Sequence, residues 1–134
     1  MSPAESGTSP SAVDAVFELD GTTVSFTGQI TDQNVERFLE TVSGREVSVL
    51  VIASGGGDVN AGMAMGDWLF DHRVDVVVDR MCMSSCANYV FTAGRRKTIN
   101  AGAIVAWHGN VLQQFDEPEA QVRAAKLWLT TYYL

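Results

Sequence analysis

Hydrophobic and polar positions alternate in residues 16–27, which read VFELDGTTVSFT. Alternation is typical of half-buried strands, and the Asp20-Gly21 pair between two such runs is a strong hairpin signal. The sequence therefore predicts a β-hairpin here. The polar stretch before it, residues 1–15, is expected to be a disordered arm.

Apolar residues next recur at helical spacing, at Val35, Phe38, Leu39 and Val42. This spacing predicts a helix with one apolar stripe. Thr31 or Asp32 suits its start and Gly44 suits its end, because these residue types favour the caps of helices.

The middle of the chain holds two continuous apolar runs, VSVLVIA at 47–53 and VDVVVD at 74–79. Such runs are typical of parallel strands that are buried on both faces. A helix is expected between them, over about 59–72. Further elements are expected as a helix over 84–93, strands over 97–100 and 103–107, and a helix over 118–134 with proline in its first turn.

Strands that alternate with helices in this way predict an α/β fold with a mostly parallel sheet. Ligands of such sheets bind at the carboxyl ends of the strands. The loops 54–58 and 80–85 both lie at that edge. With 134 residues, the chain is expected to form one domain over 16–134.

The formal net charge of -7 argues against nucleic acid or an anionic membrane as a partner. The one basic cluster, Arg95-Arg96-Lys97, is expected to be a solvated turn. No apolar run is long enough to span a bilayer, and the start lacks the features of a signal peptide. As written, the chain is expected in the cytoplasm. An exported protein whose start was processed and recloned is the alternative.

Two cysteines, Cys82 and Cys86, form either a disulfide or two buried thiols. They are too few to hold a structural zinc ion, so no metal and no cofactor is expected.

The loop SGGGDVNAG, residues 54–62, has three glycines after a predicted strand. It lacks the Gly-Lys-Ser/Thr of a phosphate-binding P-loop. One interpretation is a tight turn with Asp58 as a helix cap. The other is a site where backbone N–H groups reach a ligand, because glycine has no Cβ to keep the ligand away.

Two serines, Ser84 and Ser85, lie between the cysteines. A serine needs a base before it acts as a nucleophile. His72 is expected at a solvated helix end, whereas His108 ends the apolar run IVAWHG and has Gly109 beside it. Each of these residues alone also has an ordinary structural interpretation.

Taken together, residues 28–109 resemble the Clp-type serine peptidases of the ClpP/crotonase-like superfamily. The resemblance is greatest to uncharacterised, often exported bacterial members with a Cys-x-Ser-x-Cys core. The family's Gly-x-Ile-Thr entry is similar to residues 28–31. Its Ser-Pro-Gly-Gly-x-x-x-Ala-Gly loop is similar to residues 54–62, with Gly55 in place of proline. Its serine, followed by an apolar helix that ends in Ala-Gly, is similar to residues 84–94.

The resemblance implies a serine endopeptidase that acts on peptides or proteins. Counting back from Ala93-Gly94 puts the nucleophile on Ser85. The family's histidine, which follows a strand and a short turn, falls on His108, which would be the base. The N–H groups of Gly57 and Cys86 would form the oxyanion hole. The substrate loop would comprise Gly55, Gly56 and Asp58.

The chain departs from the family after His108, because no Asp or Glu follows the predicted helix 118–134. Relative to the family, the last unit thus looks truncated. A fragment, a Ser-His pair aided by a partner's carboxylate, and a non-catalytic relative remain as explanations. Loss of the orienting carboxylate typically costs about 10⁴ in rate. Because the 118–134 helix resembles the family's contact helix, we expect a homo-oligomer. No ATPase partner is assigned.

Three alternatives stay open. The chain is a catalytically inactive relative that binds peptides or a partner, a crotonase-like acyl-CoA enzyme, or an enzyme with Cys82 or Cys86 as its nucleophile beside His108.

Overall fold

A computed structural model describes residues 14–107 of the chain. The expectations for the arm, for His108 and for the helix 118–134 lie outside the described residues. The elements are β2 (Val16–Asp20), β3 (Thr23–Thr27), α1 (Asp32–Val42), β4 (Val49–Ser54), α2 (Val59–Asp71), β5 (Asp75–Met83), the π-helix η1 (Cys86–Val90), the 3₁₀-helix η2 (Phe91–Ala93), β6 (Lys97–Ile99) and β7 (Ile104–Ala106).

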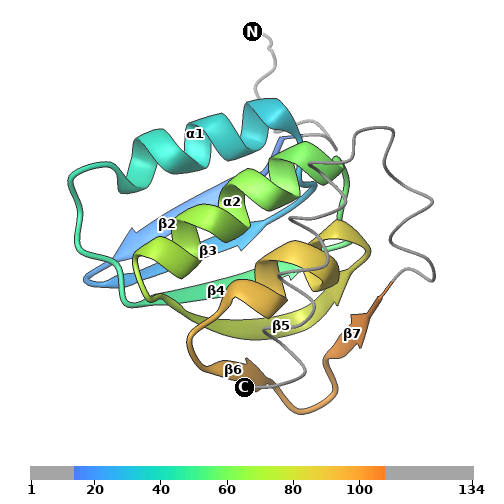
Figure 1. Ribbon diagram of the computed structural model, residues 1–134. Helices are drawn as coiled ribbons and strands as arrows, with labels where there is room; N and C mark the ends of the chain where they lie inside the picture. Colours follow the sequence, from blue (N-terminus) through green and yellow to red (C-terminus); the bar gives the residue numbers. More distant parts are fainter. Residues whose placement is uncertain (1–13, 108–134) are drawn as a thin grey trace, which may run out of the picture.

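One sheet runs through the described residues in the order β2-β3-β4-β5-β6, and β7 also pairs with β5 (Figure 1). β2 and β3 form the predicted antiparallel hairpin, in which Asp20 pairs with Thr23. The other strand pairs are parallel. The α/β fold with a mostly parallel sheet is therefore confirmed.

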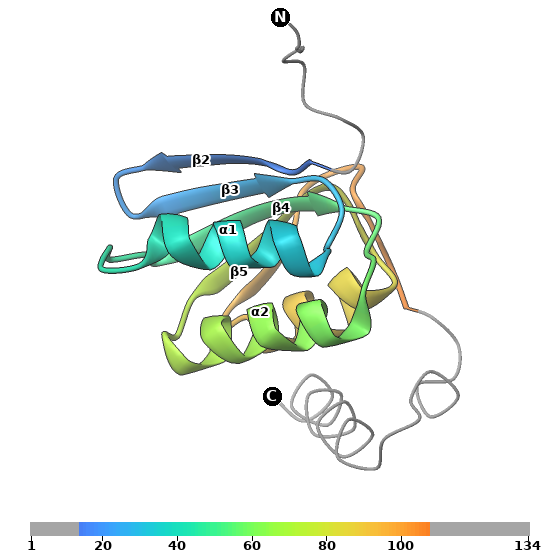
Figure 2. The same ribbon diagram turned by 90° about the horizontal axis from the view of Figure 1, so that it is seen from above.

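Helices α1 and α2 lie on the same side of the sheet (Figure 2). The predicted stripe of α1 faces inward, and the hydroxyl of Thr31 accepts a hydrogen bond from the Asn34 N–H at 3.1 Å to cap the helix. The Phe38 ring lies 5.9 Å from that of Phe26 on β3 and 5.6 Å from that of Trp68 on α2. These contacts join the sheet and both helices into one core.

The opposite side of the central strands is less covered. Along β4, Leu50 and Ile52 are buried, whereas Val49 and Val51 are half-buried. The expectation that this strand is buried on both faces is therefore wrong, because α1 and α2 cover one face only. Within residues 14–107, no helix is both long and apolar enough to cross a membrane.

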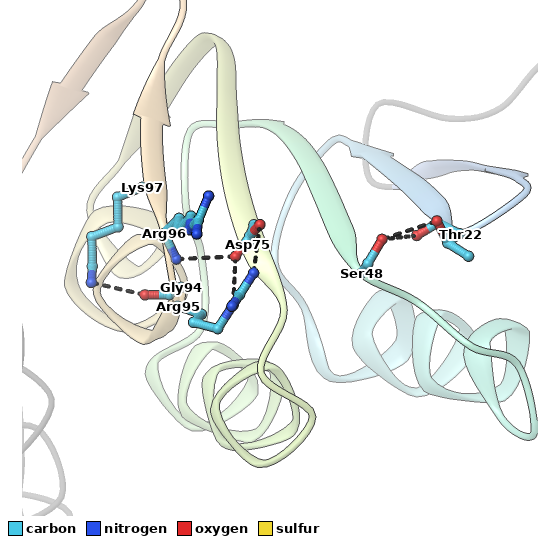
Figure 3. A network of polar contacts seen from close by, with 7 residues as sticks. All are labelled: Thr22, Ser48, Asp75, Gly94, Arg95, Arg96 and Lys97. Atoms are coloured by element: carbon cyan, nitrogen blue, oxygen red, sulfur yellow. Dashed lines mark hydrogen bonds and ion pairs between the residues drawn. The ribbon is translucent and has the colours of Figure 1, made fainter.

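The start of β5 is held to the loop before β6 by an ion pair (Figure 3). Arg95 Nε lies 3.0 Å from Asp75 Oδ1, and the Arg96 N–H donates to the same oxygen at 3.2 Å. Lys97 donates to the Gly94 carbonyl at 2.8 Å, and burial lowers the pKa of its amine. Arg95 and Arg96 are exposed, as expected of a solvated turn.

Candidate functional site

The loop after β4 lies directly against the turn after β5. A Cβ built on Gly56 would come within 2.5 Å of the Met83 carbonyl oxygen, 2.7 Å of Ser84 Cβ and 3.0 Å of the Ser85 nitrogen. Gly56 also has φ +97, a backbone conformation that side chains disfavour. Only glycine therefore allows the two predicted loops to meet.

Hydrogen bonds fix the shape of the glycine loop. The buried hydroxyl of Ser54 accepts from the Gly56 N–H at 3.0 Å. The Ile30 N–H donates to the Gly56 carbonyl at 2.9 Å. The Ile30 carbonyl accepts from the Asp58 N–H at 2.7 Å. Ile30 and Gly57 thus form an isolated parallel bridge, and Gly57 is exposed.

Asp58 has a structural role in this loop. Its carboxylate accepts a hydrogen bond from the Ala61 N–H at 2.8 Å and caps α2, as the turn interpretation predicts. Gly55 is exposed, and a Cβ there would meet nothing within 4 Å. The assignment of Gly55, Gly56 and Asp58 to a substrate loop stays a prediction.

β5 bends before it reaches the serines. Ile52 of β4 pairs with Val78, but Ser54 pairs with Cys82, so β5 carries extra residues in between. Arg80, in this bulge, has φ 71. The first part of β5 pairs with β6, and the last part, from Met81 to Met83, pairs with β7. The apolar pattern predicted a strand that ends at residue 79, whereas β5 continues to Met83 after the bend.

Ser85 follows the turn and is only 2% exposed. Within residues 14–107 its hydroxyl has no hydrogen-bond partner. A Cβ built on Gly62 of α2 would lie 3.2 Å from Ser85 Cβ. The Ser85 side chain therefore lies between the turn and that helix. A buried polar atom without a partner usually costs free energy, and such atoms are frequent at functional sites.

Cys82 and Cys86 form a disulfide, with 5.2 Å between their Cα atoms, and both are buried. The sequence left open a disulfide or two buried thiols, and the structure contains the disulfide. It spans the turn that carries both serines. While it is intact, neither cysteine offers a thiolate for nucleophilic attack. The described residues contain no cluster of side chains that could hold a metal ion.

His72 lies far from this site. It follows the last residue of α2, its ring stacks on Trp68 at 4.5 Å, and its Nδ1 lies 2.8 Å from the Trp68 carbonyl. The glycine loop is at the other end of this 13-residue helix, about 20 Å away. His72 is therefore a helix-end residue, as expected, whereas the assignment of His108 as the base stays a prediction.

The segment 84–93 is helical but not a regular α-helix. Its main part, η1, is a π-helix, in which the Phe91 N–H donates to the Cys86 carbonyl, and η2 is a 3₁₀ turn. A π turn holds one more residue than an α turn. The helix predicted over these residues is therefore confirmed, but its turns are not those of an α-helix.

Several solved structures resemble the chain, among them the following two. A putative enoyl-CoA hydratase from Rhodopseudomonas palustris CGA009 has a TM-score of 0.54 and 13% sequence identity over 96% of this chain and 64% of that protein. DspI of Pseudomonas aeruginosa has a TM-score of 0.58 and 14% identity over 94% of this chain and 60% of that protein. The chain thus spans less than two thirds of either. No protein-family model and no curated protein matches the sequence.

These similarities extend to almost the whole chain at low sequence identity, so they establish the fold and not the activity. They agree with the fold expected from the motifs in residues 28–94 and do not single out the Clp peptidases. The chain has the ClpP/crotonase-like fold.

Proposed function

We propose that this protein is a serine hydrolase that cleaves peptide bonds or related acyl compounds with a hydroxyl from the Ser84-Ser85 turn. The observation that carries the proposal is the close packing of Gly56 on this turn. It brings an exposed glycine loop and a pair of serines to one edge of the sheet.

The chemistry needs a nucleophile and donors for the oxygen that becomes negative. A serine hydroxyl would attack the carbonyl carbon, and backbone N–H groups would stabilise the tetrahedral intermediate. The Gly57 N–H on one side and an N–H just after the serine on the other would supply these donors. Removal of one such donor typically costs about 10²–10³ in rate. The base would be His108, as the resemblance implies.

A crotonase-like acyl-CoA enzyme is the second candidate. The similar structure from Rhodopseudomonas palustris is a putative enoyl-CoA hydratase, so the structural similarities favour this candidate more than a peptidase. The same backbone N–H groups would then polarise a thioester carbonyl. The serine turn and its disulfide favour the hydrolase, because a thioester-polarising site needs no serine nucleophile.

Ester and peptide hydrolysis separates the two candidates. The full chain is mixed with a p-nitrophenyl ester and with a fluorogenic peptide, and the Ser84→Ala/Ser85→Ala double variant is the control. We expect a rapid burst of released nitrophenol and slower turnover, both lost in the double variant. Unchanged hydrolysis in that variant, together with saturable binding of an acyl-CoA, would replace the hydrolase with the second candidate.

A further inference from the structure

The two serines of the turn differ sharply in their surroundings. Ser85 is 2% exposed and lies against Gly62 of α2. Ser84 is partly exposed and borders Gly56 of the glycine loop. A substrate carbonyl therefore has access to the side chain of Ser84, whereas α2 and the turn itself enclose that of Ser85.

The backbone also distinguishes Ser84. It has φ 57, whereas Ser85 has φ -63 and ψ -25, which are ordinary helical values. Ser84 is thus a single left-handed residue between the last strand residue, Met83, and the start of the helical segment. A strand, a serine in a strained turn and a helix form the arrangement that presents the nucleophile in α/β-hydrolases.

Two hydrogen bonds of the main chain hold this turn. The Ser84 N–H donates to the Ala106 carbonyl of β7 at 2.9 Å, and the Ser84 carbonyl accepts from the Asn88 N–H at 2.9 Å. The disulfide between Cys82 and Cys86 bridges it from both sides. The left-handed conformation is therefore fixed by its surroundings, as expected where strain serves a function.

Counting back from Ala93-Gly94 matches the chain to the family's motif and arrives at Ser85. The exposure of Ser84, its positive φ and its contact with Gly56 favour Ser84 instead.

We propose that Ser84, and not Ser85, carries the nucleophilic hydroxyl. This rests on the proposed function. The Ser84 Oγ forms a bond to the carbonyl carbon, and its proton passes to the base, the role that the resemblance assigns to His108. The C–N or C–O bond of the substrate then breaks and the leaving group takes that proton. Water hydrolyses the acyl-serine and restores the hydroxyl.

The oxyanion donors move by one residue as well. The N–H after the nucleophile is now that of Ser85, and only the missing Cβ of Gly56 leaves room beside it. The second donor remains the Gly57 N–H. The Ser85 side chain acquires a packing role against Gly62.

Mapping of a covalent adduct tests this assignment. The full chain reacts with a fluorophosphonate, and trypsin then releases residues 81–95, since Arg80 and Arg95 bracket a stretch free of Lys and Arg. Fragment ions between the two serines locate the adduct. Ser84→Gly accepts the positive φ and keeps the fold testable if Ser84→Ala does not. Ser48→Ala, which removes an exposed hydroxyl bonded to Thr22, is the control.

We expect the adduct on Ser84, a loss of labelling rate of at least about a hundredfold in Ser84→Gly, and a change within about threefold in Ser48→Ala. An adduct on Ser85 that survives Ser84→Gly would overturn the assignment and leave the proposed function standing. No adduct on either serine of a folded, oxidised chain would overturn both.

Discussion

Gly56 and Ser84 are in direct contact across two loops that lie 28 residues apart in the sequence, and a Cβ on Gly56 would come within 2.7 Å of Ser84 Cβ. This contact joins the edge of the sheet after β4 to the edge after β5. The candidate site depends on it, because neither loop alone offers both a nucleophile and exposed N–H donors.

Replacement of Gly56 tests the contact. Gly56→Ala introduces a Cβ into the Met83 carbonyl and the Ser84 side chain at φ +97. We expect the free energy of unfolding to fall by about 2–3 kcal/mol and hydrolysis to be lost. Gly55→Ala is the control, because a Cβ there meets nothing within 4 Å. Urea unfolding of both variants gives the comparison, and equal stabilities would refute the packing argument.

Ser54 is expected to support the same loop. Its buried hydroxyl accepts from the Gly56 N–H, so Ser54→Ala leaves a buried donor without an acceptor. We expect a loss of about 1–3 kcal/mol in unfolding free energy. Ser48→Ala, which removes an exposed hydroxyl bonded to Thr22 (Figure 3), should cost less than about 1 kcal/mol. A larger effect at Ser48 than at Ser54 would contradict this ranking.

Two substitutions of Asp58 distinguish a role as a helix cap from a role as a catalytic acid. Asp58→Asn keeps an oxygen for the Ala61 N–H, whereas Asp58→Ala removes it. We expect Asp58→Asn to retain stability and activity, and Asp58→Ala to lose about 1 kcal/mol of stability. Thermal unfolding and ester hydrolysis measure the two effects. Inactivity of a well-folded Asp58→Asn protein would show that the carboxylate takes part in the reaction.

Removal of the disulfide should loosen the serine turn. Cys82→Ala/Cys86→Ala opens a short loop, for which the chain-entropy estimate is about 2 kcal/mol. We expect lower stability and slower fluorophosphonate labelling than in the oxidised parent. Labelling at the parent rate in the double variant would mean that the turn holds its shape without the bridge.

The raised pKa of the Tyr89 phenol predicts a loss of stability at high pH. Burial raises the pKa of its phenol to about 12 from 10.0, with Asn88 acting in the opposite direction. The folded state therefore holds the proton that the unfolded state releases, so stability present below pH 10 is lost as the pH rises toward 12. Two pKa units correspond to at most about 3 kcal/mol. In Tyr89→Phe the decline between pH 10 and 12 should be shallower, and an identical decline would exclude Tyr89 as its cause.

The sequence predicted the order of elements well because periodicity and caps are local signals. The hairpin at Asp20-Gly21, the caps of Thr31 and Asp58 and the apolar stripe of α1 all depend on neighbouring residues. It could not predict the bend of β5, which depends on pairing with β7, or the π-helix after the turn. Nothing in the composition of residues 84–93 marks an extra residue in a helical turn.

The sequence predicted which loops form the candidate site but not which serine is exposed in it. The glycine loop, the disulfide as one of two options and the serine pair were named from the sequence, and the structure brings them together. The choice between Ser84 and Ser85 needed the exposure of each side chain and the φ of Ser84. Both come from tertiary packing and have no signal in the sequence.

The intact mass of the full chain after reaction with a fluorophosphonate tests the central claim most directly. We expect one adduct per chain, absent after unfolding, absent in Ser84→Ala/Ser85→Ala and unaffected by His72→Ala. An unmodified mass for the folded, oxidised wild-type chain would contradict a serine hydrolase and favour an acyl-CoA enzyme or a binding protein with the same fold.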